Sequence, residues 1–397
     1  MQTRELSLAN TEMGFKIKKD EELARSQWLF KFMRYPFLVK VLSKSVVYAL
    51  RLRLPVKWII KVTIFNQFCG GESLTESSEV ISRLNRAHVG SILDYSIEGK
   101  ENEEDFEHCK DELIKIISIA SGNKAIPYTS LKLTGIGRSE LLEKKGGFSP
   151  LTISEEVEYA WFYARLDSIC KAAMNKIVPI YFDAEETWVQ NIIDILSEEL
   201  MEKYNKENAI VLTTLQMYRR DKLDYLSKLI QKAKERHFLI GIKLVRGAYL
   251  EKENARAIKL SYTSPIHIRK EDTDRDFDSA IDLCLENIEM VTLCAGTHNE
   301  ASTLYVIKRM RELSIPPDHP HVYFSQLYGM SDHITFNLAD AGYNVTKYLP
   351  YGPIKSVIPY LIRRAQENTS IEGQIGRELS MLTEERKRRE QSRLLEA

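Results

Sequence analysis

Short apolar, β-prone runs alternate with longer amphipathic stretches from Gly70-Gly71 to about residue 370. This alternation most constrains the fold, because strand–helix repeats are typical of parallel sheets that helices cover. Most runs are continuously apolar, as expected for parallel strands buried on both faces. We expect eight strands, which end near Leu93-Asp94, Leu131-Lys132, Phe182-Asp183, Leu215-Gln216, Leu244-Val245, Gly296-Thr297, Ser325-Gln326 and Lys347-Tyr348.

The intervening helical stretches include residues 154–175, 186–204, 222–236, 277–289 and 301–313. About eight strand–helix units over about 280 residues fit a (β/α)8 TIM-type barrel, an α/β fold, in length and in rhythm. The alternative is a doubly wound open sheet. That fold favours a glycine-rich turn after its first strand, and no G-x-G-x-x-G motif is found there.

The chain divides by composition into three predicted parts. Residues 1–70 form a helical, basic and amphipathic N-terminal arm, residues 71–370 the catalytic barrel, and residues 371–397 a charged C-terminal helix. No acidic residue occurs between Glu22 and Glu72, whereas lysines and arginines alternate there with large apolar residues. Basic amphipathic helices suit an anionic membrane surface. The alternative is an arm that packs on the barrel with its lysines in water, and both descriptions can hold together.

Overall charge and cysteine content exclude several other classes. Lysine plus arginine and aspartate plus glutamate number 56 each, so a general nucleic-acid binder is disfavoured. The five cysteines show no spacing typical of a zinc or redox motif, and we expect buried thiols in a reducing compartment. No apolar run is long enough to span a bilayer, and an acidic N-terminus argues against a secretory signal or a mitochondrial transit peptide.

Polar or charged residues follow several predicted strands at the end where a barrel carries its chemistry. Each could be a satisfied core group or a helix cap, but together they predict a bound polar ligand. They are Lys132, Asp183, Gln216, Lys243, Arg246, Thr297, His298, Asn299 and Gln326.

Two adjacent arginines, Arg363 and Arg364, lie in a predicted helix near the C-terminus. Neighbouring residues on a helix point about 100° apart, so the pair cannot share one solvated face. Arginine binds carboxylates and phosphates in a bidentate manner, which predicts a clamp for an anionic substrate. No serine–histidine or cysteine–histidine pair indicates a nucleophile, and no metal site is expected. A large anionic cofactor with a small acid substrate fits this set of residues best.

Several motifs, in this order and spacing, resemble the proline dehydrogenases, which are flavoenzymes with a distorted (β/α)8 barrel. The resemblance covers roughly residues 65–370. Its motifs are Lys243-Leu244-Val245-Arg246-Gly247-Ala248-Tyr249, Thr297-His298-Asn299, Gln326-Leu327-Tyr328-Gly329-Met330, Lys347-Tyr348-Leu349-Pro350-Tyr351-Gly352-Pro353 and Tyr360-x-x-Arg363-Arg364-x-x-Glu367-Asn368.

The resemblance implies a cofactor and a substrate site at the barrel mouth. FAD is expected to contact Asp183, Gln216, Lys243, Val245, Gly247, Ala248, Thr297, His298, Asn299, Gln326, Arg364 and Glu367. The substrate is expected to contact Lys132, Arg363, Arg364, Tyr348, Tyr249 and Leu327. Many bacterial bifunctional members of the family carry an arginine near flavin N5. This chain has Lys243 at that position, and mitochondrial-type members also have a lysine there.

The resemblance also implies the reaction and its partners. The expected activity is FAD-dependent oxidation of L-proline to Δ1-pyrroline-5-carboxylate, the first step of proline catabolism, by hydride transfer to flavin N5. Electrons would pass to a membrane quinone, and a separate pyrroline-5-carboxylate dehydrogenase would take the product, because the chain is too short for the fused forms of the family. The alternatives are a hydroxyproline dehydrogenase, which Tyr348 disfavours, and a non-catalytic flavin or metabolite sensor.

The expected location is the inner face of a bacterial membrane, where the protein would be cytoplasmic and peripheral. In a eukaryote, the corresponding location is the mitochondrial inner membrane or matrix.

Overall fold

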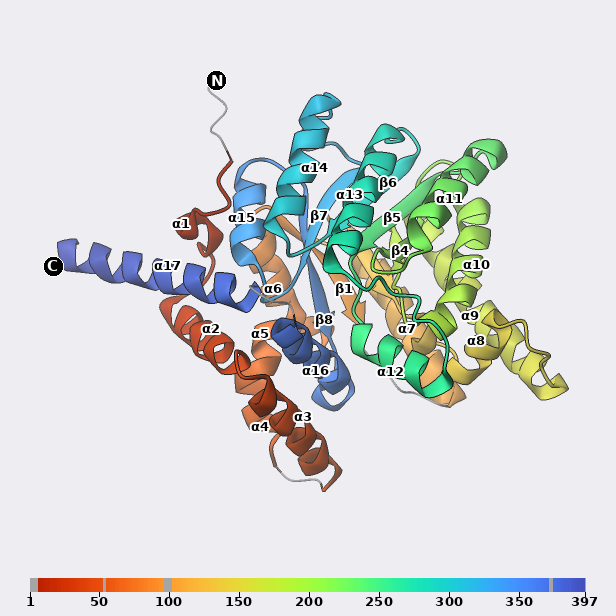
Figure 1. The fold of residues 1–397 in the computed structure, drawn as a ribbon, viewed down its shortest axis with the longest axis horizontal. Helices are drawn as coiled ribbons and strands as arrows, with labels where there is room; N and C mark the ends of the chain where they lie inside the picture. The colour runs from red at the N-terminus through yellow and green to blue at the C-terminus, as the bar shows by residue number, and fades with distance from the viewer. Residues whose placement is uncertain (1–5, 53–54, 96–101, 371–373, 397) are drawn as a thin grey trace. The chain divides into compact units, whose positions relative to one another are not determined.

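The structure is a computed structural model that describes residues 6–52, 55–95, 102–370 and 374–396. Eight parallel strands pair in chain order and close into a barrel (Figure 1). The predicted (β/α)8 architecture is therefore confirmed, and the open-sheet alternative is wrong. The strands are β1 Val89–Tyr95, β2 Tyr128–Leu131, β3 Ile180–Phe182, β4 Val211–Gln216, β5 Ile240–Val245, β6 Val291–Gly296, β7 Val322–Leu327 and β8 Val345–Tyr351.

Burial explains why these short segments form strands. Every residue of β4 is buried, including Thr213 and Thr214, as expected for a parallel strand with protein on both faces. The register of β4 and β5 pairs Leu212 with Gly241 and continues to Gln216 with Val245. Both strands therefore end at one level, and their terminal polar residues come out at the same rim.

The helices between the strands follow the predicted periodicity closely. The helices α9 Ile153–Lys176, α10 Thr187–Tyr204, α11 Lys222–Arg236, α13 Lys270–Glu286 and α14 Glu300–Glu312 correspond to the five predicted stretches. The largest difference is at α13, which begins seven residues before the predicted start because its polar first turns carry no apolar signal. The other helices of this region are α7 Glu103–Ala120, η2 Leu133–Gly135, α8 Ser139–Gly146, α12 Leu250–Leu260 and α15 Asp332–Asp340.

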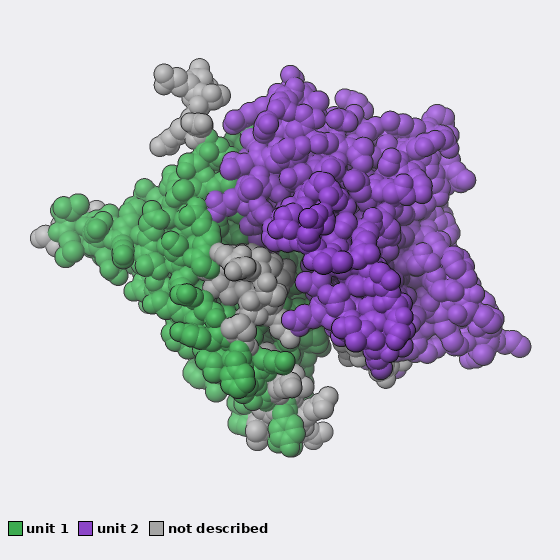
Figure 2. All heavy atoms as spheres, in the orientation of Figure 1, with its two compact units in different colours: residues 1–91, 325–397 green, residues 92–324 purple. Residues whose placement is uncertain are grey.

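Figure 2 shows the two compact units into which the chain divides, residues 1–91 with 325–397 and residues 92–324. We refer to them as unit 1 and unit 2. Unit 1 contains both terminal regions, with helices α1 Thr11–Gly14, α2 Asp20–Met33, α3 Pro36–Arg51, α4 Lys57–Ile60, η1 Lys61–Phe65, α5 Asn66–Phe68, α6 Leu74–Asn85, α16 Ile354–Ser370 and α17 Gln374–Glu396. These two units do not test the predicted division into an N-terminal arm, a barrel and a C-terminal helix, which stays a prediction.

The N-terminal and C-terminal helices of unit 1 share one hydrophobic core. Phe30 of α2 and Phe65 of η1 are buried in the same cluster as Leu361 of α16 and Met381 of α17. Helix α2 therefore buries one face, while Trp28 on its other face is 58% exposed. The N-terminal segment packs in this unit and still leaves apolar side chains in water.

Unit 1 also contains a group of three charges, the buried Asp332 and Lys347 and the half-buried Lys18. Asp332, the first residue of α15, accepts from Lys347 of β8 at 2.7 Å, and Lys18 lies 3.2 Å from its other carboxylate oxygen. Lys347 also donates to the carbonyl oxygen of Met330, at 2.5 Å. Burial opposes ionisation of Asp332, but Lys347 and Lys18 outweigh it and lower the pKa of Asp332 to about 2. The group ties β8 to the segment between β7 and α15.

We predict that Asp332→Asn lowers the free energy of unfolding by about 3–5 kcal/mol at pH 7, since it leaves the buried Lys347 without its carboxylate. The contribution of Asp332 is complete above the ordinary aspartate pKa and declines as the pH falls toward about 2, because the folded-state pKa is lowered. Urea unfolding from pH 2 to 7 measures both the loss of unfolding free energy and its dependence on pH. Asp340→Asn, at the exposed end of the same helix, is the matched control, and an equally small effect of both substitutions would contradict the prediction.

Candidate active site

Unit 2 places the predicted polar residues of β3 to β6 at the carboxyl ends of neighbouring strands. Asp183 directly follows β3 and Gln216 is the last residue of β4. Lys243 lies within β5, and Thr297 directly follows β6. All four side chains are buried, with exposed fractions of 7% or less. Buried polar groups need partners, so their contacts define how rigid this part of the site is.

Asp183 and Lys243 form a buried ion pair, with 2.5 Å between the lysine Nζ and the carboxylate Oδ1. The pair spans β4, since its residues belong to the ends of β3 and β5. The ammonium also lies 4.8 Å from the ring centroid of Tyr181, which is fully buried. A lysine in this setting is held in one place by a charge and by an aromatic face.

Gln216 is held by hydrogen bonds at both ends of its amide. Its Nε2 donates to the carbonyl oxygen of Glu185 at 2.9 Å, and its Oε1 accepts from the backbone N–H of Ala248 at 3.2 Å. These two contacts fix the orientation of the amide, with its nitrogen toward Glu185 and its oxygen toward Ala248. Gln216 therefore connects the segment after β3 with the segment after β5.

Arg246, directly after β5, organises the end of β6. Its guanidinium donates to Asp274 at 2.7 Å, to the hydroxyl of Thr297 at 2.8 Å and to Ser302 at 2.9 Å. The Thr297 hydroxyl in turn accepts from the N–H of Asn299 at 3.1 Å. Asn299 caps α14 by accepting from the N–H of Ser302 at 3.1 Å. The Thr297-His298-Asn299 motif is thus fixed at a helix N-terminus, where backbone N–H groups favour anions.

The backbone after β5 depends on a glycine. Gly247 has φ of +135°, and a Cβ atom there would lie 2.5 Å from the ring of Tyr218. Only glycine combines that conformation with such a close approach. The half-buried Val245, the exposed Ala248 and the buried Tyr249 are arranged along this turn. The close approach of this backbone to the Tyr218 ring therefore shapes the predicted segment.

Lys132 follows β2 and is half-buried at the start of η2. Two residues further on, Thr134 contacts Glu185, a buried carboxyl that the sequence reasoning did not single out. Glu185 accepts from the Thr134 N–H at 3.1 Å and from its hydroxyl. Burial raises the pKa of Glu185 to about 7, against the lowering effect of Thr134 and Lys132. The neighbouring Glu186 has the same side chain, so the sequence offered no signal to tell the buried carboxyl from the other.

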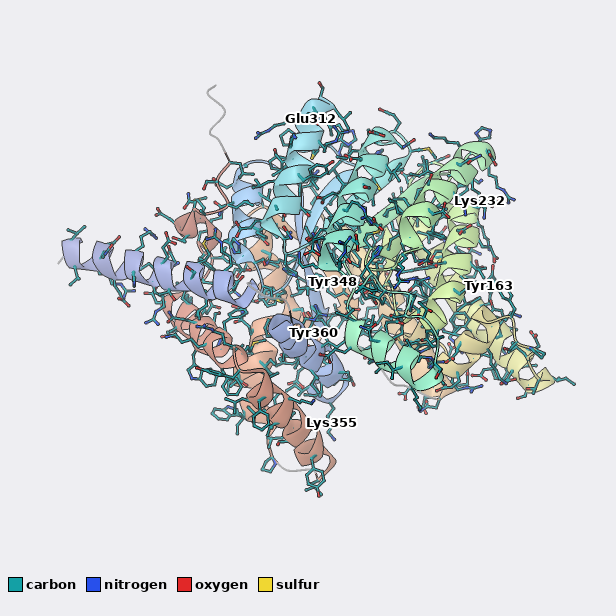
Figure 3. The ribbon with its side chains drawn as sticks, in the orientation of Figure 1. Tyr163, Lys232, Glu312, Tyr348, Lys355 and Tyr360 are labelled. Atoms are coloured by element: carbon teal, nitrogen blue, oxygen red, sulfur yellow. The ribbon has the colours of Figure 1, made fainter. Side chains whose placement is uncertain are left out.

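Unit 1 holds the remaining predicted residues. Gln326 is buried in β7 and accepts from the Thr335 hydroxyl at 2.8 Å, and Leu327 ends the strand half-buried. Tyr348 is largely buried in β8, where its carbonyl oxygen accepts from the Tyr328 N–H at 2.9 Å (Figure 3).

The arginine pair lies on α16, as predicted. Arg364 is 6% exposed and lies 5.3 Å from the ring of Tyr360, one turn earlier, whereas Arg363 is half-buried (Figure 3 labels Tyr360). The two arginines thus differ in environment, as their helical spacing requires. The side chain of Glu367 lies outside the described residues.

Other site chemistry receives no support in the described parts of the chain. Residues 6–52, 55–95, 102–370 and 374–396 contain no group of three or more His, Cys, Asp or Glu placed to hold a metal ion. The five cysteines are all buried, as expected, and form no disulfide.

Comparison with known proteins identifies the family. The proline dehydrogenase family model matches residues 77–377, which is most of the chain. The chain belongs to the proline dehydrogenase family, and the resemblance drawn from the motifs is confirmed. Family membership supports an oxidoreductase that acts on proline.

Two relatives and one solved structure show the extent of the similarity. The mitochondrial proline dehydrogenase 1 of Dictyostelium discoideum is 32% identical and covers 84% of this chain, which spans 66% of that protein. The hydroxyproline dehydrogenase of Xenopus laevis is also 32% identical, with coverages of 94% and 88%. Proline utilization A from Bdellovibrio bacteriovorus has the same fold, with a TM-score of 0.71 and 20% identity, over 93% of this chain and 37% of that chain.

We predict that Asp183 and Lys243 are energetically coupled. Asp183→Asn or Lys243→Met alone should destabilise unit 2 by about 3–5 kcal/mol, since each leaves the other charge buried. The double substitution should cost less than the two added together, by about 1–3 kcal/mol. Urea unfolding of the four proteins gives the coupling energy, and strictly additive losses would show that the pair does not act as a unit.

Proposed function

We propose that this protein oxidises L-proline to Δ1-pyrroline-5-carboxylate with FAD, by hydride transfer to flavin N5. The observation that carries the proposal is the ordered set of buried polar residues at the ends of β3 to β6, in a chain that belongs to the proline dehydrogenase family. Bridging contacts within unit 2 hold this set in place. Such preorganisation suits a cofactor site.

The donor set of unit 2 fits FAD. The cofactor combines two phosphates with a ring whose edge carries both hydrogen-bond donors and acceptors. Lys243 and Arg246 are cationic donors that each lie beside a carboxylate, the Gln216 amide is oriented, and Asn299 caps α14, whose first backbone N–H groups favour an anion. We propose that Asp183, Gln216, Lys243, Val245, Gly247, Ala248, Thr297, His298 and Asn299 of unit 2 contact the cofactor, and the contacts expected of Gln326, Arg364 and Glu367 stay predictions from the sequence.

When bound, FAD would supply the acceptor for a hydride, which the protein's own side chains cannot provide. In this oxidation the C–H bond next to the proline nitrogen would break as its hydride passes to the cofactor, a C=N bond would form, and the amine proton would leave to solvent. The residues of this chain orient the substrate. Arg363, Arg364 and Lys132 would hold its carboxylate, while Tyr249, Tyr348 and Leu327 would enclose its ring. No protein base is required if proline binds with a neutral amine.

Arg364→Met tests the carboxylate clamp. We expect the KM for proline to rise at least tenfold, since a charge-assisted contact of about 1.5–3 kcal/mol is lost. Steady-state kinetics with a dye as electron acceptor measures this, with thermal unfolding as a check on the fold. Lys355→Met, which removes an exposed cation from the same helix, is the matched control (Figure 3). A near-normal KM for the Arg364 variant would remove it from the clamp.

A hydroxyproline dehydrogenase is the second candidate, because the similar Xenopus laevis protein carries that name. The buried Tyr348 favours proline, since a tyrosine against the substrate ring leaves little space for a 4-hydroxyl group. Comparing kcat/KM for proline and 4-hydroxyproline decides between the two. Turnover of either substrate would also exclude a non-catalytic sensor.

We further propose that unit 1 contacts an anionic membrane surface and that electrons pass to a quinone there. Large apolar side chains are exposed on and around α2 to α4, including Trp28, Tyr35, Phe37, Leu38, Val41, Leu42, Tyr48, Leu52, Trp58 and Ile59. Exposed cations lie among them at Lys31, Arg34, Lys40 and Lys57. Exposed apolar patches with basic residues are typical of interfacial helices. In the described residues, none of the helices is long and apolar enough to cross a membrane.

The triple substitution of Phe37, Trp58 and Ile59 by serine should lower binding to anionic vesicles at least tenfold, because three apolar side chains lose their lipid contact. Vesicle co-sedimentation measures the change. The control replaces Phe148, Ile153 and Trp161, three exposed apolar residues of unit 2, by serine. Equal loss in both variants, or none in either, would rule out a membrane surface on α3 and α4.

The remaining partners follow from the chemistry. We propose that a separate pyrroline-5-carboxylate dehydrogenase consumes the product, and the equal numbers of basic and acidic residues disfavour a nucleic-acid partner. The Dictyostelium discoideum relative is named as mitochondrial. For this chain we propose a peripheral position on the membrane that holds its quinone.

A further inference from the structure

Glu185 makes four hydrogen bonds that join three segments of unit 2. The residue lies between β3 and α10 and is 3% exposed. Its carboxylate accepts both the N–H and the hydroxyl of Thr134, in the segment after β2. Its backbone N–H donates to Gln190 Oε1 at 2.8 Å, and its carbonyl oxygen accepts from Gln216 Nε2 at 2.9 Å. Segments carrying Lys132, Asp183 and Gln216 therefore meet at one side chain and its peptide groups.

The contact with Thr134 constrains where Lys132 can lie. Lys132 and Thr134 belong to the same tight turn, since η2 is only three residues long and starts directly after Lys132. Fixing the backbone N–H and the hydroxyl of Thr134 removes most of the freedom of this turn. Asp183, two residues before Glu185, is fixed independently by Lys243. Glu185 thus holds the turn of Lys132 against a rigid part of the site.

We propose that Glu185 is a positioning residue that holds Lys132 in place for the substrate carboxylate, and that this hold strengthens when Glu185 ionises. The inference rests on the proposed role of Lys132 in the clamp. A carboxylate offers acceptors to both donors of Thr134, whereas a carboxylic acid gives up acceptor capacity to its own proton. The residue does not itself contact the reacting atoms.

The charges around Glu185 place its ionisation within an accessible pH range. Burial raises the pKa of Glu185 to about 7. The Thr134 hydrogen bonds and the Lys132 ammonium oppose the rise, and Glu186 on the same segment adds to it. The contacts from α10 and β4 are the neutral amides of Gln190 and Gln216. Because the folded-state pKa is raised, the carboxylate predominates only above about pH 7, so the hold should weaken as the pH falls through neutrality.

The test measures binding of cyclopentanecarboxylate, a five-membered ring acid without the proline amine, so that no substrate amine titrates. Calorimetric titration of the flavin-loaded protein from pH 6 to pH 8.5 should give an affinity that increases about five- to tenfold through pH 7. In Glu185→Gln this pH-dependent increase in affinity, the step, should be absent. The affinity of the variant should stay at the level that the wild-type protein has at low pH. Thr134→Val, which keeps the side-chain shape and removes the hydroxyl, should reduce the step in the same way.

Two controls separate positioning from general damage. Thr134→Ser keeps the hydroxyl and should retain the step. Glu186→Gln removes a charge from the adjacent residue, which pairs with Lys252, and should also retain it. A step that persists in Glu185→Gln would overturn the inference. An acid that fails to bind the wild-type protein would overturn the clamp instead, which is a failure of the proposed function.

Hydrogen exchange gives a readout that needs neither substrate nor activity. The Thr134 amide donates to Glu185, so its exchange at pH 8 should be at least tenfold faster in Glu185→Ala than in the wild-type protein. The amides of β4 should keep their protection if the variant is folded. Unchanged exchange at residues 132–136 would show that Glu185 does not hold this turn.

Discussion

The buried ion pair between Asp183 and Lys243 is the interaction on which the site depends most. Neither charge can remain buried alone, so the ends of β3 and β5 are held on either side of β4. Gln216, at the end of the enclosed strand, is oriented by the segments that follow β3 and β5. The parallel register brings Asp183 and Lys243 to the level of Thr214, two residues before Gln216, and their contacts keep the three side chains at this end of the strands.

A second layer of contacts extends this order along the rim of unit 2. Arg246 fixes Thr297 and the first turn of α14, and Glu185 fixes the turn that begins at Lys132. In unit 1, the Asp332 carboxylate contacts Lys347 and Lys18, and it holds β8 to the start of α15 in a similar way. The charged groups of these clusters therefore set the positions of loops, which suits a site in which a bound cofactor would supply the chemistry.

The sequence predicted the fold well, because a buried parallel strand leaves a continuous apolar run and its end is marked by the first polar residue. It also indicated Asp183, Gln216 and Lys243, which follow or interrupt such runs. It could not predict their partners, since Asp183 and Lys243 are 60 positions apart. The spacing of apolar residues indicates which residues are buried, but it does not indicate which side chains contact each other. The same limit explains why Glu185 was missed beside Glu186, and why the core shared by α2 and α16 was not foreseen.

As proposed, this family member holds FAD and reduces it with proline. An anaerobic titration of the purified protein with L-proline, followed by its visible spectrum, shows whether proline reduces a bound flavin. We expect a yellow protein whose flavin absorption is lost as proline is added and returns when oxygen or an electron acceptor is admitted. A colourless protein, or a flavin band that keeps its intensity at saturating proline, would contradict the proposal.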